Sequence, residues 1–136
     1  MGEVEAFLTD WIREYSDHFV LSFRENDPSL VRPYCHIPSM RLTQDGVKVM
    51  ATAEEVDAHW AAAHVPLRPL DYHNSILHTV DVKLLNPGAA FITVDCGRYN
   101  VRNEEIMRFY SSYTVCKTAE GWKITSWIGH NPPGQK

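Results

Sequence analysis

Cysteine is scarce in this sequence, and the common metal-binding and nucleotide-binding patterns are missing. The three cysteines, Cys35, Cys96 and Cys116, are widely separated, and no CxxC pair, HExxH motif or glycine-rich phosphate loop occurs. An odd number of distant cysteines is typical of reduced thiols in a cytoplasmic protein. We therefore expect part-buried free thiols, no structural metal, no cofactor and no bound nucleotide.

Long apolar runs and clusters of basic residues are also missing. No apolar stretch approaches the length needed to cross a bilayer, and the acidic N-terminal segment lacks the regions of a signal peptide. Acidic residues number 17 against 13 lysines and arginines, for a net charge of -4, and the basic residues are scattered. We expect neither a membrane nor a nucleic acid as partner.

The chain has 136 residues, of which 44% are hydrophobic and 22% charged, as in ordinary globular proteins. That length predicts a single domain, 1–136, with a core over about residues 3–131. Between residues 3 and 25, aromatic side chains recur at every fourth position, as at Trp11, Tyr15 and Phe19. This spacing predicts one long amphipathic helix.

Three shorter elements are expected next. Asp27-Pro28 is a favourable N-cap and first turn for a short helix that ends at Pro33. Residues 39–51 alternate around an Asp-Gly turn and predict a small hairpin. Residues 52–64 begin with the capping residues Thr52 and Glu55 and predict a further helix.

After residue 71 the apolar period changes from helical to two. Turn residues divide the remainder into four long strands, expected at 71–85, 89–101, 105–117 and 122–130, followed by a loose tail at 131–136. Strands of that length imply a bent, twisted antiparallel sheet. With the helices segregated at the N-terminus, the fold class is α+β, and a cone-shaped sheet around helices leaves a small-molecule pocket at its mouth.

Several segments resemble one superfamily. They are the aromatic first helix, "NDPSLVRPY", the hairpin and capped helix in "MRLTQDGVKVMATAEEVDAHW", and the closing "MRFYSSYTVCKTAEGWKITSW". The chain is similar to the nuclear-transport-factor-two-like superfamily, in its SnoaL-like and ketosteroid-isomerase-like branch. The resemblance implies a cystatin-like cone. It leaves the activity open, because this fold hosts isomerases, dehydratases, cyclases and non-enzymatic binding or dimerisation domains.

The resemblance does not carry the catalytic residues of the ketosteroid isomerases. Their carboxylate base would fall near Arg41 or Leu42, their helix tyrosine near Phe19, and their protonated acid near Tyr113. Only Tyr113 retains a hydroxyl among these positions. The resemblance therefore does not support steroid isomerisation.

Two histidines in the strand 71–85 raise the question of a site. His73 and His78 are five residues apart, so a regular strand places them on opposite faces and they cannot bind one metal together. His78 shares its face with apolar residues, which predicts that it points into the cone. There it is either an acid–base residue or a core histidine satisfied by a neighbouring hydroxyl.

Tyr113 is the second catalytic candidate, because a phenol in the pocket can donate a hydrogen bond to a substrate oxygen. The alternative is a tyrosine that serves only in packing. The predicted ligand-binding residues, either aromatic walls or polar groups inside the cone, are Trp11, Tyr15, Trp60, Asn74, Asp95 and Trp127. Periodicity does not decide which face Asp95 occupies.

Three functions are compatible with this pattern. The first is a cofactor-independent acid–base enzyme, such as an isomerase, dehydratase or cyclase, acting on a small apolar oxygenated molecule. The second is a non-catalytic domain that binds a small apolar molecule or serves in dimerisation, and the third is a protein-interaction module. In each case we expect a homodimer, because the outer face of the sheet is predicted to present an apolar patch of Leu77, Leu85, Tyr110 and Cys116.

Overall fold

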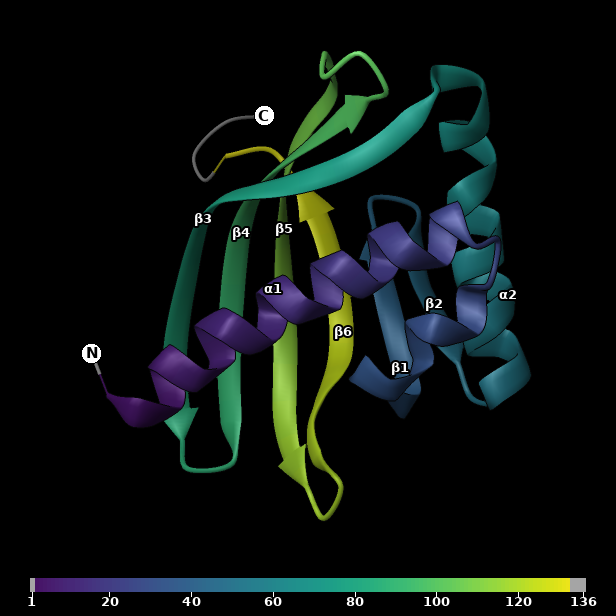
Figure 1. Ribbon diagram of the computed structural model, residues 1–136. Coiled ribbons are helices and arrows are strands. Elements are labelled where there is room, and N and C mark those ends of the chain that lie inside the picture. Colours follow the sequence, from purple (N-terminus) through teal and green to yellow (C-terminus); the bar gives the residue numbers. More distant parts are fainter. Residues whose placement is uncertain (1, 133–136) are drawn as a thin grey trace.

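The computed structural model describes residues 2–132, so most of the predicted tail lies outside the described residues. The elements are, in chain order, α1 (Glu3–Arg24), η1 (Pro28–Leu30), η2 (Arg32–Tyr34), β1 (Cys35–Thr43), β2 (Gly46–Met50), α2 (Ala53–His64), η3 (Val65–Leu70), β3 (Tyr72–Asn86), β4 (Ala89–Asn100), β5 (Glu105–Thr118) and β6 (Gly121–His130). Helix α1 crosses one face of a curved sheet, and α2 lies beside the β1–β2 hairpin (Figure 1). The predicted α+β class is confirmed.

Helix α1 is long because its apolar positions recur with helical spacing over its whole length. Trp11, Tyr15 and Phe19 are buried against the sheet and α2, as the spacing predicts. The helix ends where Asn26 adopts a left-handed conformation, with φ of 53°. This helix therefore supplies one complete aromatic wall of the interior.

The short elements begin at capping side chains. The carboxylate of Asp27 accepts a hydrogen bond from the backbone of Ser29 at 3.1 Å, but the segment that follows forms two 3-10 turns instead of one helix. The hydroxyl of Thr52 accepts a hydrogen bond from the backbone of Glu55 at 3.1 Å and caps α2 as predicted.

No helix among residues 2–132 is both long and apolar enough to cross a membrane.

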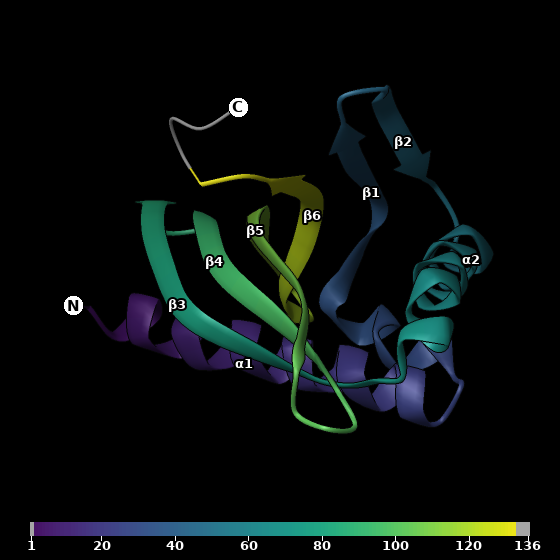
Figure 2. The same cartoon turned by 90° about the horizontal axis from the view of Figure 1, so that it is seen from above.

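The sheet has six strands in the order β2-β1-β6-β5-β4-β3. Most neighbouring strands pair antiparallel as expected, but β1 pairs with β6 in parallel, so the sheet is mixed instead of wholly antiparallel. The hairpin thereby extends the main sheet, and Figure 2 shows the strongly curved, unclosed surface that results. The concave face holds the core.

Strand β3 has three shifts of register against β4, and the first two set which side chains face the core. Its register to β4 shifts between Tyr72 and Asn74 and again between Leu77 and Thr79. Each inserted residue reverses the alternation of the side chains, because two residues on one strand then oppose one on the other. The predicted alternation is therefore inverted between the two bulges and restored after the second.

This inversion corrects two predictions. His78 does not point into the cone: it is exposed on the outer face, where its Nε2 atom lies 2.9 Å from the hydroxyl of Tyr99. Leu77, expected in the outer apolar patch, instead faces the core and is 8% exposed. Both errors arise from treating β3 as a regular strand.

Candidate functional site

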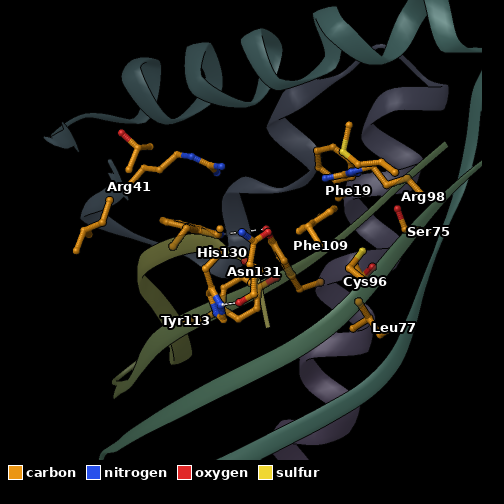
Figure 3. Close-up of a pocket in the computed structure, with 18 of the residues that line it drawn as sticks. Phe19, Arg41, Ser75, Leu77, Cys96, Arg98, Phe109, Tyr113, His130 and Asn131 are labelled. Carbon is orange, nitrogen blue, oxygen red and sulfur yellow. Dashed lines mark hydrogen bonds between the residues drawn. The ribbon is translucent and has the colours of Figure 1, made fainter. Parts of the chain in front are cut away.

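A pocket of about 580 Å³ lies between α1, α2 and the concave face of the sheet. Its volume is within the range of small-molecule sites. The ring-bearing residues of its wall are Tyr15, Phe19, Trp60, Phe109, Tyr113, Trp127 and His130, and its other polar residues include Arg41, Ser75, Cys96, Arg98, Ser111 and Asn131. Figure 3 shows several of these side chains gathered around the opening from elements distant in sequence.

The aromatic wall is held together by edge-to-face ring contacts. The ring of Tyr15 meets those of Tyr113 at 5.7 Å and Trp60 at 6.1 Å, and Trp60 meets Trp127 at 5.6 Å. The indole N–H of Trp127 donates to the hydroxyl of Tyr15 at 3.0 Å. Rings locked in this way present a preorganised apolar surface to a flat ligand.

Two tyrosine hydroxyls in the wall remain protonated at neutral pH. Burial raises the pKa of Tyr113 to about 12 and also raises the pKa of Tyr15 well above its usual value. Burial also raises the pKa of the neighbouring Cys96 thiol, so this group stays protonated at neutral pH as well. These groups can exchange hydrogen bonds with a ligand, but a phenol so hard to ionise is a poor proton donor near pH 7.

Arg98 brings a positive charge into this aromatic surrounding. Its guanidinium carbon lies 4.6 Å from the ring centre of Phe19, 5.1 Å from that of Phe109 and 5.5 Å from that of Tyr72. Such contacts contribute roughly 0.5–2 kcal/mol each according to how far the cation is desolvated. No carboxylate of the described residues forms an ion pair with Arg98.

Arg41 lies at the pocket wall formed by β1. It is half-buried, pairs in the sheet with Trp127, and has no ion pair with any carboxylate in the part of the chain described. Figure 3 shows Arg41 and Arg98 extending toward one another from two sides of the opening. Since the described lining contains no aspartate or glutamate, the pocket is positively charged in a protein whose net charge is -4.

The one histidine at the rim is already engaged in hydrogen bonds. The Nδ1 atom of His130 lies 2.5 Å from the carbonyl oxygen of Asn131 and must donate to it. In the neutral ring Nε2 then accepts from the hydroxyl of Ser112, 2.7 Å away. His130 therefore offers no free nitrogen to a ligand in this arrangement.

Four of the predicted site residues line this pocket, namely Tyr15, Trp60, Tyr113 and Trp127. Their expected location is therefore observed, whereas their roles in binding or catalysis stay predictions. The structure does not bring the other four to the pocket. His78 and Asn74 are displaced by the bulges of β3, and the other two are Trp11 and Asp95.

Trp11 and Asp95 are occupied elsewhere. Trp11 packs in the core, with its ring 5.6 Å from that of Tyr34. Asp95 lies on the outer face, where the guanidinium of Arg108 donates to it at 2.6 and 2.9 Å. Those hydrogen bonds lower the pKa of Asp95, so it is a paired structural carboxylate and not an inward base.

The sequence interpretation missed Arg98 and Arg41 as pocket residues. In β4, Ile92, Val94 and Cys96 are buried on the concave face, and regular alternation places Arg98 on the same face. That signal was available from the sequence. Among residues 2–132 no group of three or more potential metal ligands is close enough to hold an ion.

Residues 4–132 match the family described as NTF2-like protein (DUF6841). The chain belongs to this family. The predicted superfamily is thereby confirmed. No curated protein matches the chain.

Solved structures share the fold at low sequence identity. Aln2 from a Streptomyces species has a TM-score of 0.72 and 10% identity, over 96% of this chain and 92% of that one. A domain of unknown function with a cystatin-like fold from Nostoc punctiforme has a TM-score of 0.68 and 14% identity, over 97% and 80%. A protein described as a ketosteroid isomerase candidate from Shewanella frigidimarina has a TM-score of 0.63 and 14% identity, over 85% and 91%. These likenesses support the cystatin-like, NTF2-like cone and nothing more specific.

Proposed function

We propose that this chain binds a small, flat, largely apolar molecule with oxygen substituents in the pocket between α1, α2 and the sheet. The observation that carries the proposal is the wall of interlocked rings around a pocket of about 580 Å³. Rings held at fixed angles stack on a planar ligand with little loss of side-chain freedom. The protonated hydroxyls of Tyr15 and Tyr113 orient its oxygen atoms.

Binding without catalysis is the better-supported form of this function. Acid–base catalysis requires a group that exchanges protons near neutral pH and reaches the substrate. The described lining provides two tyrosines with raised pKa values and a histidine engaged on both nitrogens, and it contains no carboxylate. An acid–base enzyme is the second candidate, with Tyr113 as hydrogen-bond donor to the substrate.

A neutral fluorescent ligand tests the binding proposal without involving charge. N-phenyl-1-naphthylamine is expected to bind the wild-type protein, with a blue-shifted emission in the apolar pocket. Leu77→Trp fills the pocket from β3, whereas Ile76→Trp places the same ring on the exposed outer face one residue away. We expect binding to weaken at least tenfold in the first variant and to persist in the second. Equal binding by both variants, or none by the wild type, would refute the proposal.

A further inference from the structure

A second hollow of about 390 Å³ adjoins the pocket at Trp60. The two cavities share Arg41, Arg98, Phe19, Trp60 and Met107 along their common boundary. Both arginines therefore border both compartments, one on each side of the opening in Figure 3. A ligand that lies against the rings of the main pocket extends its end toward this boundary.

His59 is a buried polar residue of the hollow. It is 7% exposed, and its Nε2 atom is fully covered and has no hydrogen-bond partner among the described residues. Because Nε2 is covered, an occupant of the hollow meets the ring of His59 without reaching this atom. Burial lowers the pKa of His59 to about 4, helped by the charges of Arg41 and Lys48, so the ring is neutral at pH 7.

The charges around the hollow all have one sign. Arg41, Lys48 and Arg98 line it, and none of its described lining residues is acidic. The described carboxylates that form ion pairs with arginines lie outside the hollow; examples are Asp57 with Arg32 and Asp95 with Arg108. Two guanidinium groups facing one cavity without a counter-charge favour an anion, and their planar forks match the geometry of an oxyanion.

We infer that the ligand of this pocket is an aromatic carboxylate whose carboxylate group lies between Arg41 and Arg98, on the side of the hollow where the ring of His59 lies. This inference rests on the proposed binding function and adds the charged group. A singly charged carboxylate fits better than a doubly charged phosphate ester, because the aromatic surroundings make each additional charge costly to desolvate. The rings of Tyr15, Trp60 and Trp127 hold the apolar body.

Matched acid and amide pairs test the inference by isothermal titration calorimetry. We expect 2-naphthoate to bind wild-type protein at least tenfold more tightly than 2-naphthamide, and cinnamate to exceed cinnamamide in the same way. Arg41→Met and Arg98→Met each reduce the acid-to-amide ratio toward one. Arg68→Gln removes the same charge from an exposed arginine outside both cavities and leaves the ratio unchanged. Tighter binding of naphthyl phosphate than of naphthoate would overturn the choice of carboxylate.

The pKa of His59 reports whether the carboxylate of the ligand lies near this ring. An adjacent carboxylate stabilises the imidazolium, so the pKa of His59 in a nuclear magnetic resonance titration rises when 2-naphthoate is bound and changes little with 2-naphthamide. An unchanged pKa in the naphthoate complex would overturn the assigned location. If N-phenyl-1-naphthylamine binds, and 2-naphthoate and 2-naphthamide bind equally tightly, the inference fails while the binding function stands. If none of these compounds binds, both fail.

Discussion

The Nε2 atom of His78 lies 2.9 Å from the hydroxyl of Tyr99, on the face of the sheet that points away from the pocket. The same hydroxyl donates to Glu105 at 3.1 Å, and Glu105 accepts in turn from Arg108 at 3.2 Å. The histidine that the sequence pattern favours as catalytic thus belongs to an exposed polar network. Its position gives it no access to a molecule bound among the aromatic rings.

Replacing His78 is therefore expected to leave binding unchanged. His78→Ala removes one hydrogen bond at an exposed site, which costs less than about 1 kcal/mol of folding free energy. Fluorescence titration with N-phenyl-1-naphthylamine should give the wild-type dissociation constant within a factor of two. Leu77→Ala, one residue away but facing the pocket, is the matched control and should weaken binding. A tenfold loss in His78→Ala alone would contradict the assignment of faces.

The first two bulges of β3 explain why regular alternation predicts the core-facing residues at Tyr72 and from Val80 on, but not those between the bulges. Tyr72 and Val80 contact the core as a regular strand predicts, because the second inserted residue cancels the first. A bulge is defined by the partner strand, and so the sequence of β3 alone cannot reveal it. One signal does lie in β4: Gly97 sits within a strand, where glycine often marks a close approach. A Cβ atom there would lie 2.9 Å from the Tyr99 hydroxyl and 3.0 Å from Nε2 of His78.

The aromatic wall was easier to predict than the charge of the pocket. Tyr15 and Trp60 follow helical spacing in α1 and α2, which predicts that their rings face the interior. The inward position of Arg98 follows from alternation in β4. Arg98 and Arg41 line one cavity because β1 pairs in parallel with β6, a long-range contact that local patterns do not encode. The described lining of that cavity contains no carboxylate.

The hydrogen bond between Trp127 and Tyr15 is expected to stabilise the fold. Trp127 is 2% exposed, and Tyr15→Phe leaves its indole N–H without the acceptor at 3.0 Å. An unpaired buried donor costs about 1–3 kcal/mol, measured as a lower free energy of unfolding in urea. The double variant Tyr15→Phe/Trp127→Phe completes a thermodynamic cycle and should show a coupling free energy of about 1 kcal/mol. Additive effects would mean that the contact does not contribute.

The ion pair of Asp95 with Arg108 predicts a pH-dependent contribution to stability. Hydrogen bonds from Arg108 lower the pKa of Asp95 in the folded state, so its stabilising effect is present above its usual pKa near 3.8 and is lost as the pH falls through the folded value. Asp95→Asn should therefore lower the urea midpoint at pH 7 and have little effect near pH 2. Asp81→Asn is the control, because Asp81 is an exposed carboxylate of β3 that forms no ion pair within residues 2–132. A constant difference across this range would contradict the linkage.

His59 predicts a second pH range in which acid lowers the stability of the fold, at higher pH than the range set by Asp95. Its pKa is lowered to about 4 in the folded protein, against an ordinary value of 6.5, so the unfolded chain takes up its proton first as the pH falls. The stabilisation is complete above pH 6.5 and declines from there to about pH 4. His59→Gln should flatten part of that decline in urea unfolding experiments. Buried His64, whose pKa is also lowered, contributes a further part of the decline, so His59→Gln/His64→Gln should flatten it further. An undiminished decline in His59→Gln would show that His59 is not buried as a neutral ring.

Because a carboxylate beside His59 raises its folded pKa, saturating 2-naphthoate should narrow the pH range of this decline in the wild type and not in Arg41→Met.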